Sequence, residues 1–248
     1  MARDHIVKAY DEQLNRLNQL IAEMGGRAEA QLAGSVQALV RRDSRLAAQL
    51  VEQDARIDEL ETEVDRFAVQ LLALRQPMAS DLRNIVGAIR IAGDLERIAD
   101  YATNVAKRTL ALSQLPAAAP ARSIPRMSQP VEAMIRDVLD AYIRRDHALA
   151  VEVWKRDSEV DDIYNSLFRE LLTYMMEDPR NITACTHLLF VAKNIERIGD
   201  HVTNIAETVH FLVTGERIVE ARPKSDETSS FALAAPRPGG ATPPAQPD

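Results

Sequence analysis

Four pairs of acidic residues, each pair separated by four positions, are the best candidates for chemistry in this 248-residue chain. The pairs are Asp54 and Asp58, Glu96 and Asp100, Asp157 and Asp161, and Glu196 and Asp200. On a helix, residues four apart share a face, so each pair would project two carboxylates in one direction. The chain has 37 acidic residues, enough for several such pairs to arise by chance. The spacing alone is therefore not evidence of a site.

The stronger evidence is the position of the pairs relative to two expected turns. The first two pairs lie at equal distances on either side of Pro77, and the other two are centred on the turn at Asp178 and Pro179. Antiparallel helices joined at these turns rise equally per residue, so each hairpin would set its two pairs side by side. We therefore expect two clusters. The first quartet is Asp54, Asp58, Glu96 and Asp100, and the second quartet is Asp157, Asp161, Glu196 and Asp200.

Crowded carboxylates need protons, arginine partners or a bound cation to offset their repulsion. An all-oxygen ligand set favours hard cations, such as Mn²⁺, Mg²⁺, Ca²⁺ or iron, at both quartets. The alternative is that these residues are ordinary solvated acids. In that case they would pair with neighbouring arginines, namely Arg56, Arg97, Arg156 and Arg197.

The two quartets are not expected to be equivalent. Glu61 and Asp65 extend the acidic stripe in the first half of the chain, whereas Tyr164 and Phe168 stand at the corresponding places in the second half. The first quartet should therefore be the more negative of the two.

The elements that must position these residues occur twice. The sequence ERIADYATNVA at residues 96–106 returns as ERIGDHVTNIA at 196–206, with seven of eleven positions identical. Upstream, the tripeptide RRD at 41–43 returns at 144–146. A repeat of this length predicts two small domains, because solenoid repeats usually span only ~20–50 residues.

Apolar residues recur every three or four positions within each repeat, which predicts helices, and no sustained alternating pattern predicts a strand. Asp43 or Ser44 should cap the second helix and Ser80 the third. We expect an all-α fold of two tandem antiparallel three-helix bundles. The predicted boundaries are 1–113 for the first bundle, 114–125 for a linker, 126–217 for the second bundle and 218–248 for a disordered tail rich in Pro and Ala.

Composition excludes several classes of function. A net charge of −7 argues against a nucleic-acid partner. Cys185 is the only cysteine, which excludes an internal disulfide and a cysteine-based metal site, and its apolar neighbours suggest that it packs in the core. Neither a signal peptide nor a membrane-spanning run is evident, so we expect a soluble, cytoplasmic protein without direct membrane insertion.

Four stretches of the chain resemble the PhoU family of phosphate-signalling regulators. They are YDEQL at 10–14 with MG at 24–25, QPMASDLR at 76–83, DLERIADYATNVA at 94–106, and IERIGDHVTNIAE at 195–207. The last stretch continues into FLVTGE at 211–216, and the resemblance covers about residues 3–217. Ala99 departs slightly from the Gly199 of the second repeat, and the tail lies outside the resemblance.

The resemblance implies a cytoplasmic protein, often a homodimer, that is not an enzyme. It implies a negative regulator of phosphate uptake and of the phosphate-starvation response. Its partners would be the ATPase subunit of a phosphate ABC transporter and a sensor histidine kinase. The family's acidic motifs are associated with multinuclear metal sites, which here correspond to the same eight carboxylates and to Mn, Mg or Fe as the cofactor.

Two other interpretations remain open at this point. A di-iron carboxylate enzyme needs two Glu-x-x-His motifs, but the chain has only one, from Glu207 to His210, and Lys107 and Leu110 stand at the equivalent places. A passive helical scaffold without metal is the other. Metal content separates this scaffold from the metal-binding regulator.

Overall fold

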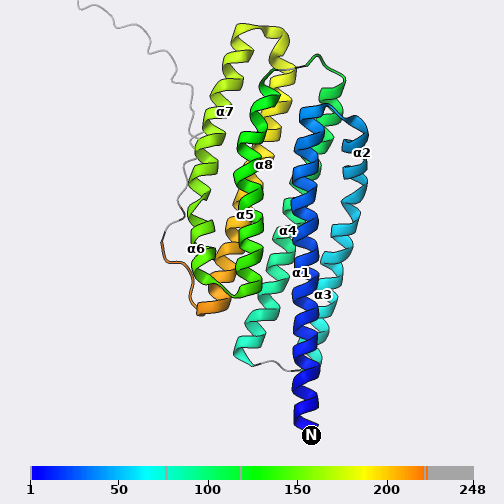
Figure 1. Ribbon diagram of the computed structural model, residues 1–248, viewed down its shortest axis with the longest axis vertical. Coiled ribbons are helices and arrows are strands. Elements are labelled where there is room, and N and C mark those ends of the chain that lie inside the picture. Colours follow the sequence, from blue (N-terminus) through cyan, green and yellow to red (C-terminus); the bar gives the residue numbers. More distant parts are fainter. Residues whose placement is uncertain (1, 76–77, 118, 221, 223–248) are drawn as a thin grey trace, which may run out of the picture.

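The computed structural model describes the backbone of residues 2–75, 78–117, 119–220 and 222, and no strand occurs among them (Figure 1). The helices run close to the long axis of the molecule. The first repeat comprises α1 (Ala2–Arg41), α2 (Ser44–Gln53), α3 (Ala55–Arg75) and α4 (Ala79–Ser113). The second comprises α5 (Ile124–Arg144), α6 (His147–Lys155), α7 (Asp157–Glu177) and α8 (Ile182–Thr214), with short 3₁₀ helices η1 (Ala119–Ser123) and η2 (Pro179–Asn181). The all-α prediction is confirmed.

The repeated RRD tripeptide forms the same sharp turn in both halves. Arg42 and Arg145 both adopt the left-handed conformation, with φ of 55°. The following aspartates then cap the next helix: Asp43 accepts a hydrogen bond from the Leu46 amide, and Asp146 accepts from the amides of Ala148 and Leu149. The repeat in sequence therefore encodes a left-handed residue followed by an N-cap, which turns the chain back on itself.

The middle helix of each repeat is interrupted, although the apolar pattern predicted one continuous helix. The interruption falls at Asp54 between α2 and α3, and at Arg156 between α6 and α7. Near each break the backbone makes hydrogen bonds of the 3₁₀ type, such as Ile57 N to Asp54 O and Glu159 N to Arg156 O. The first break lies at the first acidic residue of its quartet and the second lies one residue before it, and local tightening of a helix often marks a functional position.

The two repeats share one continuous hydrophobic core. The central helices α4 and α8 pack against each other, and α1 packs against α5. Glycines allow two of these close approaches. A Cβ atom on Gly25 would stand 2.4 Å from a methyl group of Leu139, and one on Gly87 would stand 2.5 Å from a methyl group of Leu212. Gly25 therefore serves packing between the repeats, and the glycine pair at 25–26 does not end α1.

Several boundaries differ from the predicted ones. The turn expected at Pro77 lies outside the described residues. The α4 helix begins after Met78, and no side chain caps it, so the expected cap at Ser80 is wrong. At the second turn Asp178 caps η2 through the Arg180 amide, and α8 follows. The expected linker contains η1, and α5 begins at Ile124.

The segment that follows α8 lies against the bundle as far as the structure describes it. Gly215 ends α8 in the left-handed conformation, with φ of 78°, and Ile218 packs against the core. Arg222 forms ion pairs with the second repeat. The sequence interpretation placed the start of the tail at residue 218, whereas Ile218 and Arg222 both contact the bundle. Residues 223–248 lie outside the described part.

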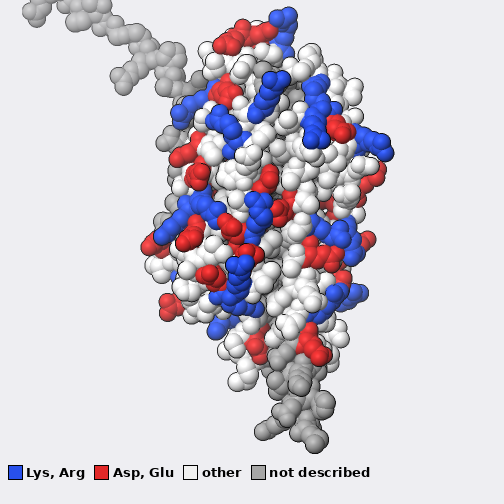
Figure 2. Space-filling model, viewed as in Figure 1, with Lys and Arg blue, Asp and Glu red and all other residues white. Residues whose placement is uncertain are grey.

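Charges of both signs are interspersed over the face shown in Figure 2. Within the described ranges no helix is both long and apolar enough to cross a membrane. Cys185 is fully buried in the core, and burial raises the pKa of its thiol. A buried thiol of this kind is a packing residue and a poor nucleophile.

Candidate metal centres

The first quartet gathers where the break between α2 and α3 faces α4. Burial raises the pKa of Asp54, a hydrogen bond with Thr103 opposes that rise, and the charges of Asp100 and Asp58 add to it. The Asp54 Oδ1 atom is buried without a hydrogen-bond partner among the described residues. An orphaned carboxylate oxygen beside other carboxylates is a position where a cation would be stabilising.

Glu96 is the most perturbed acid of the first quartet. Burial and the neighbouring charge of Asp100 raise the pKa of Glu96 to about 7, while Arg97 partly opposes the shift. Glu61 contributes further repulsion, as the extended acidic stripe predicted, and its own pKa is raised by burial and by Asp65. Near neutral pH Glu96 is therefore protonated in part of the molecules. In the rest it is ionised, and its charge is repelled by the neighbouring carboxylates.

A Glu96→Gln substitution is expected to stabilise chelator-treated protein at pH 8 but not at pH 5. The pKa of Glu96 is about 7 in the folded protein against an ordinary 4.5, so the folded state keeps a proton that the unfolded chain releases. Raising the pH through this window therefore costs stability, and glutamine removes that cost. The nominal shift corresponds to ~3 kcal/mol, which solvent screening reduces to about 1–2 kcal/mol.

Urea unfolding at the two pH values measures this difference, with the exposed Glu52→Gln as the control. A pH-independent difference between wild type and Glu96→Gln would contradict the assignment of the raised pKa to Glu96.

The second quartet gathers at the equivalent place but is more deeply buried. The exposed fractions of Asp157, Asp161 and Glu196 are 3%, 4% and 5%. The Thr203 hydroxyl lies 3.1 Å from Asp157 Oδ1, which matches the hydrogen bond between Thr103 and Asp54 in the first repeat. The structure therefore brings both predicted quartets to matching sites, each with a threonine that the sequence analysis did not assign to it.

Two cations of the protein itself neutralise the second quartet. Lys193 Nζ lies 2.9 Å from Glu196 Oε1, and Arg222 Nη2 lies 2.8 Å from Asp200 Oδ1. Arg222 Nε also lies 2.8 Å from Asp157 Oδ2. Lys193 stands where the first repeat has Gly93, so aligning the two repeats could have revealed it. Arg222 lies beyond the repeat, and no sequence pattern pointed to it.

The arginine partners proposed for solvated acids match the structure only at Arg97. Arg97 lies 3.2 Å from both Glu96 Oε2 and Asp100 Oδ2, and its side chain is 57% exposed. The other three arginines have different contacts in the structure. Arg56 pairs with Glu59 and Glu23, Arg156 pairs with Asp137, and Arg197 lies over the Tyr101 ring.

The two quartets therefore differ in their fit to a metal ion. In the described part of the chain, no three His, Cys, Asp or Glu side chains are arranged to hold one ion as they stand. At the first quartet, the orphaned Asp54 oxygen and the mutual repulsion of the carboxylates fit a cation that would draw them together. At the second quartet, Arg222 and Lys193 already supply positive charge, so those residues do not fit an additional cation.

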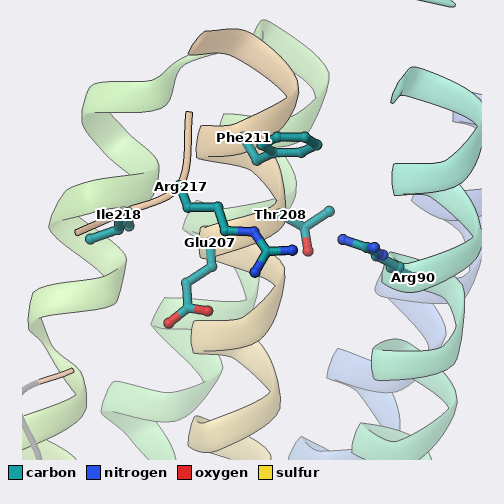
Figure 3. Close-up of a pocket in the computed structure, with 6 residues that line it drawn as sticks. All are labelled: Arg90, Glu207, Thr208, Phe211, Arg217 and Ile218. Atoms are coloured by element: carbon teal, nitrogen blue, oxygen red, sulfur yellow. The ribbon is translucent and has the colours of Figure 1, made fainter. Parts of the chain in front are cut away.

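An open hollow of about 490 Å³ gives solvent access to the first quartet. Glu61, Glu96 and Arg97 line it from the first repeat, and Asn204 and Thr208 line it from α8. A second hollow of about 530 Å³ shares Arg90, Glu207 and Thr208 with it. Figure 3 shows Arg90 on α4 and Arg217 after α8 approaching this second hollow from opposite sides of Thr208. None of the eight quartet residues lines the second hollow.

The single Glu-x-x-His motif has other contacts in the structure. Glu207 Oε1 accepts a hydrogen bond of 3.0 Å from the Trp154 indole. The His210 ring packs edge-on against His147, with 5.9 Å between ring centroids. The motif thus joins α8 to α6.

Comparison with known proteins agrees with the repeat and with the fold. The PhoU domain model matches residues 21–109 and 124–209. A "Phosphate-specific transport system accessory protein PhoU homolog" of Caulobacter vibrioides is 54% identical over 227 residues, which cover 91% of this chain and 99% of that protein. The Rhizobium meliloti protein of the same description is 51% identical over 233 residues, which cover 93% of this chain and 98% of that protein.

Solved structures give the same answer. The crystal structure of PhoU from Pseudomonas aeruginosa matches with a TM-score of 0.80 and 40% identity, covering 84% of this chain and all of that one. The phosphate transport system regulatory protein PhoU from Streptococcus pneumoniae matches with a TM-score of 0.78 and 27% identity, covering 84% and 99%. With both repeats matched by the family model and relatives aligned over nearly their whole length, this chain belongs to the PhoU family.

Proposed function

We propose that this protein is an accessory protein of a phosphate-specific transport system and a negative regulator of the phosphate-starvation response. The observation that supports this is the alignment of both repeats with accessory proteins of such systems over 91% of the chain. In this role the protein acts in the cytoplasm and performs no catalysis. It couples the ATPase subunit of a phosphate ABC transporter to a sensor histidine kinase, as a homodimer.

The mixed surface charge in Figure 2 suits binding to protein partners. Interfaces between proteins are on average about as polar as the rest of the surface, and complementary charges help to select the partner. A regulator that must exchange partners as phosphate changes does not need a large apolar interface. The interspersed charges on that face are compatible with such reversible contacts.

The first quartet is proposed to hold a hard cation, such as Mn²⁺, Mg²⁺ or iron. Asp54, Asp58, Glu96 and Asp100 would supply the oxygen ligands, and the cation would offset the repulsion that raises the pKa values of Asp54 and Glu96. Its role would be structural, because it would fix the break between α2 and α3 against α4. A passive scaffold without metal is the competing possibility, and thermal melts distinguish the two.

Deleting the gene is expected to raise expression of phosphate-starvation genes in phosphate-rich medium, because the repressing partner is lost. A reporter for a starvation promoter measures this, and a plasmid copy of the wild-type chain should restore repression. Unchanged expression in a strain without a second copy of the family would refute the regulatory role.

Recovery of partners with tagged protein is the companion measurement. Cells grown at high and low phosphate are compared, and both the ATPase subunit and the sensor kinase are expected at high phosphate. Failure to recover either protein under both conditions would refute the coupling role.

A further inference from the structure

The side chain of Arg222 makes several polar contacts with two residues of the second quartet, Asp157 and Asp200. Its Nε lies 2.8 Å from Asp157 Oδ2, and its Nη2 lies 3.0 Å from Asp157 Oδ1. The same Nη2 lies 2.8 Å from Asp200 Oδ1 and donates to the Asp200 carbonyl oxygen at 3.1 Å. A planar guanidinium that engages one carboxylate with two nitrogens and a second carboxylate beside it forms charge-assisted bonds of the strong, geometrically specific kind.

This arginine is shielded from solvent, and described residues before it pack against the bundle. Its side chain is 18% exposed, against 57% for Arg97 at the first quartet. The described residues that carry it, 215–220 and 222, are called here the C-terminal strap. The strap leaves α8 through the left-handed Gly215 and packs Ile218 against the core before it reaches the quartet. Low exposure reduces screening of the ion pairs, so they count for more than surface pairs.

The first repeat has no counterpart of this contact among its described residues. After α4 the chain passes through η1 into α5, and Arg42 donates to the carbonyl oxygens of Ser113 and Leu115 there. The Asp54 Oδ1 atom keeps no hydrogen-bond partner, whereas both oxygens of its equivalent, Asp157, are engaged by Arg222. Two sites built by the same repeat thus differ in how the chain's own cation engages them: Arg222 is largely buried between Asp157 and Asp200, whereas Arg97 pairs with Glu96 and Asp100 from an exposed position.

We propose that Arg222 is a built-in cation that excludes divalent metal ions from the second quartet. Removing the guanidinium would take away the positive charge that engages Asp157 and Asp200, two of the four carboxylates of this quartet. Such a set of oxygens is what a hard divalent cation binds. The protein therefore carries one quartet that is open to solvent and one that is occupied by Arg222.

This inference extends the metal part of the proposed function, but its test is independent of the first quartet. All variants are made in the full chain carrying Glu96→Gln and Asp100→Asn, so binding at the first quartet is already disabled. Trp154 is the only tryptophan in the chain and precedes Asp157 by three residues. Paramagnetic Mn²⁺ at the second quartet should therefore quench its fluorescence, and equilibrium dialysis counts the ions bound.

The expected results concern Mn²⁺ alone as the probe. The background variant should neither bind Mn²⁺ measurably nor show quenching. Adding Arg222→Ala should create binding that is at least about tenfold tighter, with quenching of Trp154, because an intramolecular competitor has been removed. Arg217→Ala, which removes an exposed arginine from the same strap, should leave the background unchanged. Further addition of Asp157→Asn and Asp200→Asn should abolish the new binding.

Two results would overturn the proposal. One is Mn²⁺ binding with Trp154 quenching in the background variant while Arg222 is intact. The other is the absence of new binding in a folded Arg222→Ala variant, with folding checked by circular dichroism. Should Arg222→Ala not fold, Arg222→Gln keeps much of the side-chain volume without the charge and is judged by the same criteria. Failure of the wild-type protein to bind Mn²⁺ would count against the first quartet and leave this proposal to its own test.

Discussion

Saturating Mn²⁺ is expected to stabilise the wild-type protein by about 3 kcal/mol at a hundred times its dissociation constant, and to leave the Glu96→Gln/Asp100→Asn variant unaffected. The ion would bind the folded first quartet and not the unfolded chain, so its binding free energy adds to stability. The substitutions keep the size of both side chains and remove two charges. Without metal the same variant should be more stable than the wild type, because the repulsion that raises the pKa of Glu96 has been removed.

The measurement is a thermal melt of both proteins with chelator and with added Mn²⁺. The matched control is Glu52→Gln with Asp162→Asn, which removes the same charge from two exposed positions outside the quartets. This control should respond to Mn²⁺ as the wild type does. A wild-type melt that ignores both chelator and Mn²⁺, with a more stable double variant, would eliminate the metal and favour the passive scaffold.

The positions of the quartets could be predicted because they depend on counting residues along regular helices. Asp54 and Asp100 lie at equal distances from Pro77, as do Asp58 and Glu96, and the constant rise of a helix brings equally distant residues together. The repeated RRD tripeptide likewise has a local cause, since Asp43 and Asp146 each cap the helix that follows directly. Where the determinant is local, the sequence pattern was sufficient.

The interruptions of the middle helices could not be predicted from local sequence. Neither Asp54 nor Arg156 is a helix breaker such as Pro or Gly, and the apolar stripe continues past both. The breaks accompany contacts with the neighbouring central helix, where Thr103 and Thr203 bond to Asp54 and Asp157. Such tertiary contacts override intrinsic propensity, which is a weak preference in any helix.

The cation at the second quartet was missed for a related reason. The ion pair between Arg222 and Asp157 joins residues 65 positions apart, and Arg222 has no equivalent in the first repeat. The sequence interpretation assigned Arg222 to the tail. The residues beside it in the sequence do not distinguish it from other arginines. The replacement of Gly93 by Lys193, in contrast, was visible by aligning the repeats, and it already indicated that the second quartet is less negative than the first.

The hydrophobic core that the two repeats share was also not predicted from the apolar pattern, although the sequence of α4 contained an indication of it. The α4 helix buries residues on a face wider than a three-helix bundle needs, including small ones such as Ala88, Ala92 and Ala99. A broad apolar face with small residues allows close approach of a second helix. The sequence interpretation assigned that face to its own bundle, whereas the structure packs it against α8 from the other repeat.

Separating the repeats is therefore expected to unfold both of them or to force them to associate. Expressed alone, residues 1–117 would expose the face of α4 that packs on α8, together with the niches that Leu139 and Leu212 fill beside Gly25 and Gly87. Burial of one leucine contributes ~1.5–3 kcal/mol, and a whole domain is stable by only ~5–15 kcal/mol. The loss of a complete helix face should thus remove most of the stability of each half.

Size-exclusion chromatography and circular dichroism of residues 1–117 and 119–248, alone and co-expressed, measure the effect. Each half alone should aggregate, self-associate or melt without cooperativity, whereas the co-expressed halves should form a complex that melts cooperatively. Intact protein cut after folding, at a protease site inserted near residue 117, is the control and should keep its melting behaviour because the packing is unchanged. A monomeric half that melts cooperatively near the temperature of the whole chain would show that each repeat folds on its own, as the division into two bundles first suggested.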